Sequence, residues 1–184
     1  RTVLQNNLAA LENGKHGICY ASGLAATDCL LRLFKAGDEV ISMAVLKRFD
    51  ATSEEREDYL KAAAWKGEGL TPILSETRHA QFAAAEQFIL TVTSNGYGKR
   101  SSAFEYRRTN RGGQGITNID TGPRNGRVVA SFPVKPGEQI MLATDQGKMI
   151  RTTVGSIRIA GRNTQGVMIF RVDASEHVVS VAKI

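Results

Sequence analysis

The stretch "RRTNRGGQGI" at residues 107–116 returns downstream as "RIAGRNTQGV" at residues 158–167. Sliding the chain against itself by 51 positions, without a gap, gives eight identities in 27 positions, from Ile89 on Ile140 to Gly115 on Gly166. A fixed spacing of this size is typical of repeat architectures, in which each copy forms one supersecondary unit. The sequence therefore predicts two copies of one structural repeat.

Each copy is built from predicted strands. The runs "FILTVTSNGYGKR" (88–100) and "IMLATDQGKMIR" (140–151) are apolar or β-branched and are broken by Asn-Gly and Gln-Gly, which favour tight hairpin turns. A closing strand with alternating apolar residues follows in each copy, "GRVVASFPV" at 126–134 and "EHVVSVAKI" at 176–184. About four short strands in about 50 residues is typical of one propeller blade. We therefore predict a mainly β fold with two β-propeller blades, at residues 88–134 and 138–184.

The segment at residues 40–87 is predicted to hold a further closing strand and an inserted helix. The stretch "DEVISMAVL" at 38–46 has the same alternation as the two later closing strands. The stretch "ATSEEREDYLKAAAWKGEG" begins with Thr52 or Ser53 as an N-cap, has acidic residues in its first turn, and continues through helix formers to Gly67. We expect a helical insertion between blades.

The positive charge of the chain is concentrated in the repeats. Net charge is 0 over residues 1–46, −2 over residues 47–87 and +8 over residues 88–184, which sums to the formal +6 of the chain. Each lysine or arginine laid on a phosphate releases condensed counterions, so this distribution favours a polyanion such as nucleic acid as the partner. The predicted DNA-binding residues are Lys99, Arg100, Arg107, Arg108, Arg111, Arg151, Arg158 and Arg162.

Two interpretations of these basic residues remain open. Any single arginine on a sheet is as well explained by the solvated face of that sheet as by a phosphate contact. Recurrence at equivalent places in both copies favours rows of arginines that follow a nucleic-acid backbone. Because few aromatic residues accompany them (Tyr97, Phe104 and Tyr106), contacts to duplex phosphates are favoured over base stacking on a single strand.

Composition places further limits on function. The chain is 42% hydrophobic and has no apolar run long enough to span a bilayer, and no signal peptide is recognised, so we expect no membrane partner. The two cysteines, Cys19 and Cys29, lack metal-ligand spacing and are expected to be buried free thiols in a reducing compartment. We predict no metal site.

Several of these stretches resemble a known family. The stretches "QFILTVTSNGYGKRSS", "EYRRTNRGGQGI", "RNGRVVASFPV", "QIMLATDQGKMIR" and "IRIAGRNTQGV" are similar to the last blades of the C-terminal domain of bacterial DNA gyrase A, and the resemblance covers about residues 40–184. It implies a strand-swapped propeller (β-pinwheel) that wraps duplex DNA around a basic rim, with other gyrase subunits as partners, in the bacterial cytoplasm at the nucleoid. Wrapping of this kind relies on backbone contacts and on the bending of DNA.

The sequence departs from that family pattern in two respects. The family's signature heptapeptide, Gln-Arg-Arg-Gly-Gly-Arg/Lys-Gly, is represented only by the degenerate "TNRGGQG" at 109–115. No counterpart of the region that carries the catalytic tyrosine is recognised. We therefore expect no DNA cleavage by this chain, which resembles the non-catalytic part of an ATP-dependent topoisomerase.

Residues 1–39 predict a small α/β fragment of a different kind. A helix (2–12), a strand (18–20), a Ser-Gly turn and a second helix (24–35) follow one another, and a helix N-terminus after such a turn suits either a phosphate or an ordinary chain reversal. The stretch resembles the start of pyridoxal-phosphate enzymes of the cystathionine lyase and synthase group. That resemblance implies that Ser22, Gly23 and Leu24 bind the phosphate of the cofactor. No lysine can be assigned to the Schiff base, so no bound cofactor is expected.

The two resemblances meet near residues 37–43 and indicate a composite chain. Three functions remain open: a non-catalytic DNA-binding fragment, a pyridoxal-phosphate-dependent lyase or transferase fragment of sulfur amino-acid metabolism, and a functionless composite scaffold. The length of the gyrase resemblance and the charge of the repeats favour the first. The scaffold ranks close behind, because two blades without a closed ring bury limited apolar surface.

Overall fold

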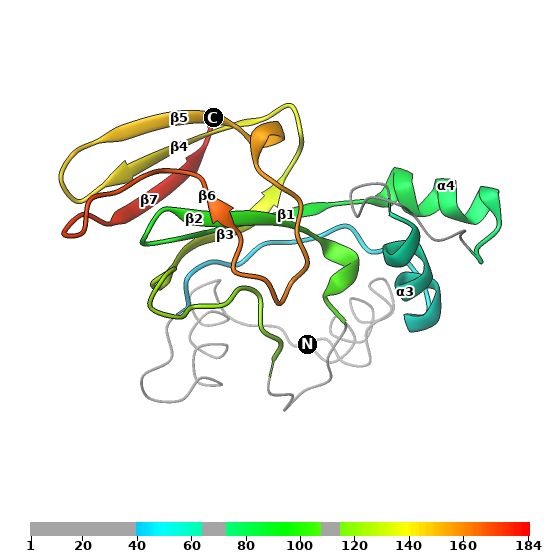
Figure 1. Ribbon diagram of the computed structural model, residues 1–184. Coiled ribbons are helices and arrows are strands. Elements are labelled where there is room, and N and C mark those ends of the chain that lie inside the picture. The colour runs from blue at the N-terminus through cyan, green and yellow to red at the C-terminus, as the bar shows by residue number, and fades with distance from the viewer. Residues whose placement is uncertain (1–39, 64–72, 108–114) are drawn as a thin grey trace, which may run out of the picture. The chain divides into compact units, whose positions relative to one another are not determined.

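The structure is a computed structural model that describes residues 40–63, 73–107 and 115–184. The chain divides after Val40, and the elements below all belong to the second unit, Ile41–Ile184 (Figure 1). The predicted N-terminal fragment lies outside the described residues, and so do Ser22, Gly23 and Leu24.

The described residues of the second unit form two antiparallel sheets. In the first, the strand order is β3-β1-β2-β6, and in the second it is β5-β4-β7. The strands are β1 (Phe88–Thr93), β2 (Tyr97–Ser102), β3 (Val128–Val134), β4 (Gln139–Thr144), β5 (Met149–Thr153), β6 (Val167–Met168) and β7 (Val178–Lys183). The mainly β fold predicted from the repeats is confirmed.

The two repeats share local detail as well as strand order. The β1–β2 and β4–β5 turns each contain a glycine with positive φ, Gly96 at 77° and Gly147 at 80°. Each hairpin runs into a short 3-10 helix, η2 (Ala103–Glu105) or η3 (Val154–Ser156), offset by the same 51 residues. The ladders to the closing strands shift register at Val92/Thr93 and at Ala143/Thr144, which are equivalent places. The sequence repeat is therefore also a backbone repeat.

The first sheet is completed by a strand from the second repeat. β6 pairs antiparallel with β2, and Ile159 forms a parallel bridge with Arg100 beside it. The amide of Arg100 donates to the carbonyl of Arg158 at 3.0 Å, and the amide of Ala160 donates to the carbonyl of Arg100 at 2.8 Å. This exchange between neighbouring repeats is the strand swap that the gyrase resemblance implied.

One apolar core joins the two repeats. It is formed by buried side chains of both central strands and their neighbours, and Phe132, Ile169 and Phe170 pack against it. Burying each such side chain stabilises the fold by about 1.5–3 kcal/mol, so each sheet stabilises the other. Its buried members are Leu90, Val92, Val134, Ile140, Leu142, Val154, Ile157 and Val178.

Within the described residues, two helices precede the first sheet. Helix α3 (Ser53–Ala62) begins at the predicted N-cap Thr52, whose hydroxyl accepts from the amide of Glu55 while the Glu55 carboxylate accepts from the amide of Thr52. The predicted end at Gly67 is wrong, because Ala63 already has the extended backbone of a C-cap. Helix α4 (Glu76–Ala85), capped by Ser75, was not predicted. An ion pair of 2.8 Å between Glu55 and Arg78 joins the two helices.

An aromatic cluster fixes the helices to the first repeat. Tyr59 of α3 and Phe82 of α4 stack with ring centroids 5.0 Å apart, and Phe104 of η2 lies 5.0 Å from Phe82. Phe49 contacts the same group from the preceding segment. The residue equivalent to Phe104 in the second repeat is Gly155, so only the first repeat offers this contact.

The prediction of a closing strand at 38–46 is wrong for the residues that the structure describes. Its described part, residues 40–46, forms no strand, and four of its apolar side chains are exposed: Val40, Ile41, Met43 and Val45. A side chain links this segment to β3, since the Ser42 hydroxyl donates to the carbonyl of Ser131. Alternating apolar residues form a strand only where the backbone also forms hydrogen bonds with a neighbouring strand. Among the described residues, this segment pairs with no strand.

Candidate nucleic-acid interface

The sequence predicts that Lys99 contacts DNA, but its side chain is fully buried. Its ammonium group donates to the carbonyls of Gly161 at 2.6 Å and Arg162 at 2.5 Å. Burial lowers the pKa of Lys99 to about 8, although the nearby Glu105 carboxylate acts to raise it. The prediction for Lys99 is corrected, because a lysine that holds the 161–164 turn from inside the protein cannot reach a phosphate.

Arg100 is corrected for the same reason. Its side chain is 7% exposed, and the guanidinium donates to the carbonyls of Ile157 at 2.7 Å and Gly155 at 3.1 Å. Burial lowers the pKa of Arg100. Both acceptors belong to the second repeat, so Arg100 joins the two repeats where the sequence predicted a surface contact.

Arg107 and Arg162 lie beside one hollow between the helices and the second repeat. Its volume is about 930 Å³. Arg107 is exposed, while the guanidinium of Arg162 donates to the carbonyl of Thr117 at 2.6 Å and its amide donates to the Glu105 carboxylate at 2.5 Å. Arg56 and Lys61 of α3 also line the hollow. Sequence reasoning missed these two, because they belong to a segment of net negative charge.

The remaining predicted arginines divide into two groups. Arg151 and Arg158 are exposed on the second repeat, and the Arg151 guanidinium donates to the side-chain oxygen of Gln139. Arg108 and Arg111 lie outside the described residues. Arg107 and Arg158 are therefore the one equivalent pair of predicted arginines that the structure describes as exposed in both repeats.

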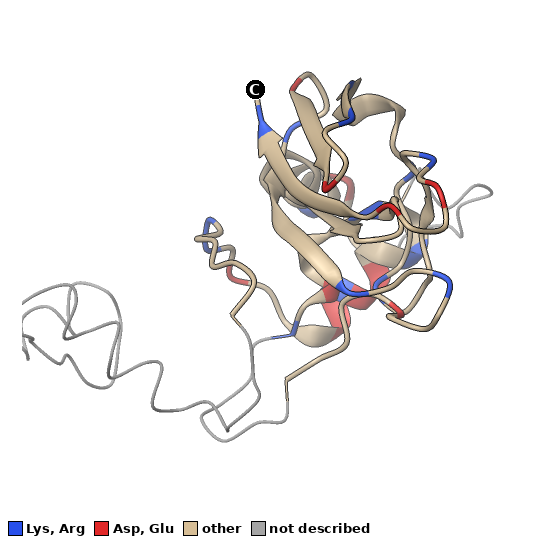
Figure 2. Cartoon of the chain, turned by 90° about the vertical axis from the view of Figure 1, so that its left-hand side faces the viewer, with Lys and Arg blue, Asp and Glu red and all other residues tan. Residues whose placement is uncertain are grey.

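A second basic hollow lies where the segment before α3 meets the closing strands. Its volume is about 520 Å³, and two of its four basic side chains are paired, Arg48 with Asp50 at 2.9 Å and Lys183 with Glu138 at 3.2 Å. The other two are Lys47 and Lys135. Figure 2 shows lysines and arginines at turns and strand ends of both repeats. The positive charge is thus spread over several turns.

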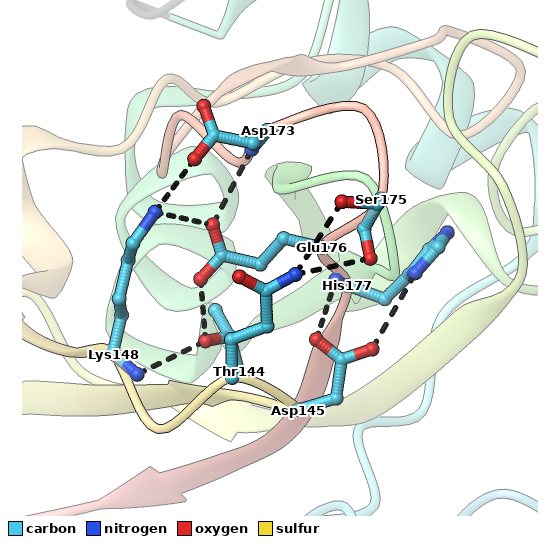
Figure 3. Close-up of polar contacts among 8 residues, drawn as sticks. Thr144, Asp145, Lys148, Asp173, Ser175, Glu176 and His177 are labelled. Atoms are coloured by element: carbon cyan, nitrogen blue, oxygen red, sulfur yellow. Dashed lines mark hydrogen bonds and ion pairs between the residues drawn. The ribbon is translucent and has the colours of Figure 1, made fainter.

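Lys148 has a structural role instead. Figure 3 shows its ammonium between two carboxylates, Asp173 at 2.8 Å and Glu176 at 2.7 Å, which together raise its pKa. Glu176 is buried, and it also accepts from the Thr144 hydroxyl at 2.6 Å. These contacts join the β4–β5 turn to the loop before β7. The Lys148 ammonium group is therefore already paired with carboxylates and is not expected to bind an external anion.

The aromatic residues of the first repeat are occupied within the fold. Arg124 lies over the ring of Tyr97 at 4.4 Å from its centroid, and Phe104 is buried against the helices. The hydroxyl of Tyr106 donates to the side-chain oxygen of Asn118. The Phe104 ring is therefore unavailable for base stacking, and the rings of Tyr97 and Tyr106 are each half-buried.

The described ranges contain no group of histidine, cysteine and carboxylate side chains that could hold a metal ion. Within the same ranges, no helix is long and apolar enough to cross a membrane. Pyridoxal-phosphate binding by Ser22, Gly23 and Leu24 stays a prediction, since these residues are outside the described part of the chain.

Comparison with known proteins supports both resemblances found in the sequence. The model of the family "DNA gyrase C-terminal domain, beta-propeller" matches residues 87–135 and 138–184, and that of the family "Cys/Met metabolism PLP-dependent enzyme" matches residues 1–66. The two repeats predicted at 88–134 and 138–184 coincide closely with the two matched ranges of the first family.

Individual relatives give the same result. DNA gyrase A of Granulibacter bethesdensis is 46% identical over 168 residues, which cover 79% of this chain and 18% of that protein. DNA gyrase A of Rickettsia conorii is 47% identical over 159 residues, covering 80% of this chain and 18% of its own length. The chain thus spans less than a fifth of the curated relatives it matches. A solved DNA gyrase A C-terminal domain superposes with a TM-score of 0.50 at 29% identity, over 53% of this chain and 33% of that one.

Proposed function

The chain belongs to the family of the DNA gyrase C-terminal domain, and from this we propose that its repeats bind duplex DNA along the phosphate backbone without catalysing a reaction. The observation that carries the proposal is the equivalent, exposed pair Arg107 and Arg158, 51 residues apart in a segment of net charge +8. Repetition of one exposed arginine on successive repeats gives regularly placed contacts, which suit a polymer of evenly spaced charges.

Arg162 extends this pair toward the inserted helices. It shares the hollow of about 930 Å³ with Arg107, Arg56 and Lys61, and the carboxylates of Glu57 and Glu105 line it as well. Four cations and two carboxylates therefore surround one open space, and the excess of cations would attract a phosphate. Arg158 and Arg162 on the second repeat, with Arg107 on the first, form the surface that we assign to DNA.

Duplex DNA is favoured over single strands by the state of the aromatic residues. Single-strand binders stack bases on exposed rings, and each such contact contributes about 1–3 kcal/mol. Tyr97, Phe104 and Tyr106 are already engaged by Arg124, the helices and Asn118. Binding would therefore rest on backbone contacts and show little dependence on base sequence.

We further infer a setting for this activity from the relatives. They are bacterial DNA gyrase A proteins, which supports a role for this chain beside DNA in the bacterial cytoplasm, at the nucleoid and with other gyrase subunits. The pyridoxal-phosphate match supports a fragment related to sulfur amino-acid enzymes, but the chain offers no assignable Schiff-base lysine.

The proposal is tested with charge reversals in the whole chain, measured by duplex binding across a salt series. Arg107→Glu and Arg158→Glu should each weaken binding about equally for unrelated DNA sequences, and each should lower the slope of log affinity against log salt by about one. Arg171→Glu is the matched control, because it makes the same change of charge at an exposed arginine outside the assigned surface.

Three results would count against the proposal. If the unmodified chain fails to bind duplex DNA at low salt, the hypothesis of a functionless composite scaffold is favoured instead. An equal effect of Arg171→Glu would mean that net charge alone acts and the assigned surface is wrong. A loss confined to one DNA sequence would indicate base readout.

A further inference from the structure

Strand β5 has an unpaired edge among the described strands, whereas the same edge of its equivalent in the first repeat, β2, is paired with β6. β2 has β1 on one side and β6 on the other, whereas β5, its equivalent in the second repeat, pairs only with β4 among the described strands. The outward-facing residues of β5 are exposed, and the Met149 residue is 63% accessible. An unpaired edge of this kind presents a row of free amide and carbonyl groups.

The filled edge of β2 shows what fits such a site. Arg100 uses its amide and carbonyl to pair with residues 158–160, and its guanidinium binds the carbonyls of Gly155 and Ile157. Further along, Gly166 approaches the carbonyl of Gly98 so closely that a Cβ at Gly166 would lie 2.6 Å from the Gly98 oxygen. Strand, arginine and glycine thus form one docking unit.

Arg151 occupies the place of Arg100 in the second repeat. Both lie opposite the same position of their hairpin partner, Arg100 across from Leu90 and Arg151 across from Met141. Along an antiparallel strand, the backbone amide and carbonyl groups of successive residues point alternately to one side and to the other. Those of Arg151 point away from β4, as those of Arg100 point away from β1. Its guanidinium has Gln139 as a partner, while that of Arg100 has two backbone carbonyls. The acceptor half of the docking unit is therefore present at β5.

Part of the donor half is described in the first repeat, because residues 108 and 109, the equivalents of residues 159 and 160, lie outside the described residues. Gly115 is equivalent to Gly166 and has the same φ of 74°, but a Cβ built on it meets no atom of the described residues within 4 Å. Ile116 and Thr117 correspond to the two residues of β6, and they form no strand in the described structure. The backbone conformation that seats one glycine against a neighbouring strand is thus repeated at Gly115 with open space before it.

We propose that the β5 edge of one copy of this chain binds residues 115–117 of a second copy. By the register of β2 with β6, Met149 would lie opposite Ile116 and Lys148 opposite Thr117. The Arg151 guanidinium would donate to the carbonyls of Phe104 and Tyr106 of the second copy, which correspond to Gly155 and Ile157. The contact joins two different surfaces, so association is head to tail and continues until a ring closes.

The proposal rests on sheet geometry and does not depend on DNA binding. Its first test is analytical ultracentrifugation of the whole chain without DNA, over a series of concentrations. The mean mass should rise with concentration. A chain that stays monomeric through the submillimolar range would overturn the proposal and leave the DNA proposal untouched.

Substitutions of Arg151 test whether association depends on the β5 edge or on another surface. Arg151→Pro removes the outward-facing amide and the guanidinium, and proline is tolerated on an edge strand, so association should be abolished while circular dichroism stays unchanged. Arg151→Ala keeps the amide and should weaken association about tenfold. Arg171→Ala, the matched loss of an exposed arginine, should have no effect. Oligomers that persist in Arg151→Pro would place the interface elsewhere.

Cysteine crosslinking tests the register itself, and it also covers the case in which Arg151→Pro fails to fold. In chains with Cys19→Ser and Cys29→Ser, one carrying Met149→Cys and the other Ile116→Cys, mixing under mild oxidation should give a mixed disulfide, because directly opposed residues have Cβ atoms about 4.5–5.5 Å apart. Chains with Met149→Cys alone should crosslink far less. Equal crosslinking in both mixtures would contradict the pairing.

Discussion

Gly96 and Gly147 hold the same position in the two hairpins, with φ of 77° and 80°, but only Gly96 faces another backbone. A Cβ on Gly96 would lie 1.9 Å from the carbonyl oxygen of Phe170, whereas a Cβ on Gly147 would meet no atom of the described chain within 4 Å. The carbonyl of Gly96 also accepts from the amides of Ile169 and Phe170, at 2.8 and 3.0 Å. The first turn therefore carries the contact between repeats, and the second contacts the loop before β7 of its own repeat.

This difference predicts unequal costs for one substitution. Gly147→Ala should destabilise the protein by about 1 kcal/mol, since a left-handed backbone disfavours a side chain. Gly96→Ala should cost at least about 2 kcal/mol, because residues 169–170 must also move away. Urea unfolding measures both values, and equal costs would mean that the Phe170 contact contributes nothing.

Phe104 is predicted to hold the two helices on the first repeat. Phe104→Ala should destabilise the protein by about 3 kcal/mol, because it removes a buried ring from a cluster that has few other members. Amide hydrogen exchange should accelerate in α3 and α4 while the amides of β1 and β4 stay protected. Phe132→Ala, which removes a ring from the core between the sheets, is the control and should loosen the strands instead.

Glu86 predicts a stability that falls as pH rises. Burial raises the pKa of Glu86 to about 7 from 4.5, although the Ser102 hydroxyl donates to its carboxylate at 2.9 Å. A raised folded pKa means that the folded state holds the proton more tightly than the unfolded state. Its contribution is complete below pH 4.5 and is lost as pH rises to about 7. Unfolding midpoints across this range measure the loss, and Glu86→Gln should flatten it.

A pH profile that Glu86→Gln leaves unchanged would contradict this assignment. Lys99 provides an internal comparison of opposite sign, because its pKa is lowered from 10.5 to about 8. The folded state therefore releases that proton more readily, and stability should rise between about pH 8 and 10.5. The two windows do not overlap, so one titration resolves both groups.

Glu176 predicts sensitivity to acid. Hydrogen bonds from Lys148 and then from Thr144 lower the pKa of Glu176. Its contribution is present above pH 4.5 and is lost as pH falls through the lowered value. Glu176→Gln should lower the melting temperature at neutral pH and remove much of the acid dependence. Asp173→Asn, at the exposed partner of Lys148, should have a smaller effect, and an equal effect would assign the stabilisation to surface charge.

The repeat allowed much of the fold to be predicted. Gly96 and Gly147 mark both hairpin turns, and the 51-residue spacing carries over to η2 and η3. Helix α4 was missed, although Ser75 is its N-cap, because no apolar periodicity stands out in a short run rich in alanine.

The site was less predictable than the fold. Lys99 and Arg100 are consecutive charged residues of β2 and point to opposite faces of the strand, yet both are buried by loops of the next repeat. Nothing in a strand's own sequence tells which edge or face a distant segment will cover. The same residue type at Arg151 is exposed only because no segment of the described chain lies on β5.

The pairing of β2 with β6 also orders events during synthesis. Gly98 lies opposite Val167, 69 positions later in the chain, so a ribosome that has released the first hairpin must still make most of the second repeat before that sheet is complete. Such distant contacts raise contact order and slow folding. Until then the nascent chain displays the bare edge of β2 to its surroundings, where unpaired edges associate with other chains. The β2–β6 pairing that joins the repeats in the folded protein is thus also the step that leaves the nascent chain open to association with other chains during synthesis.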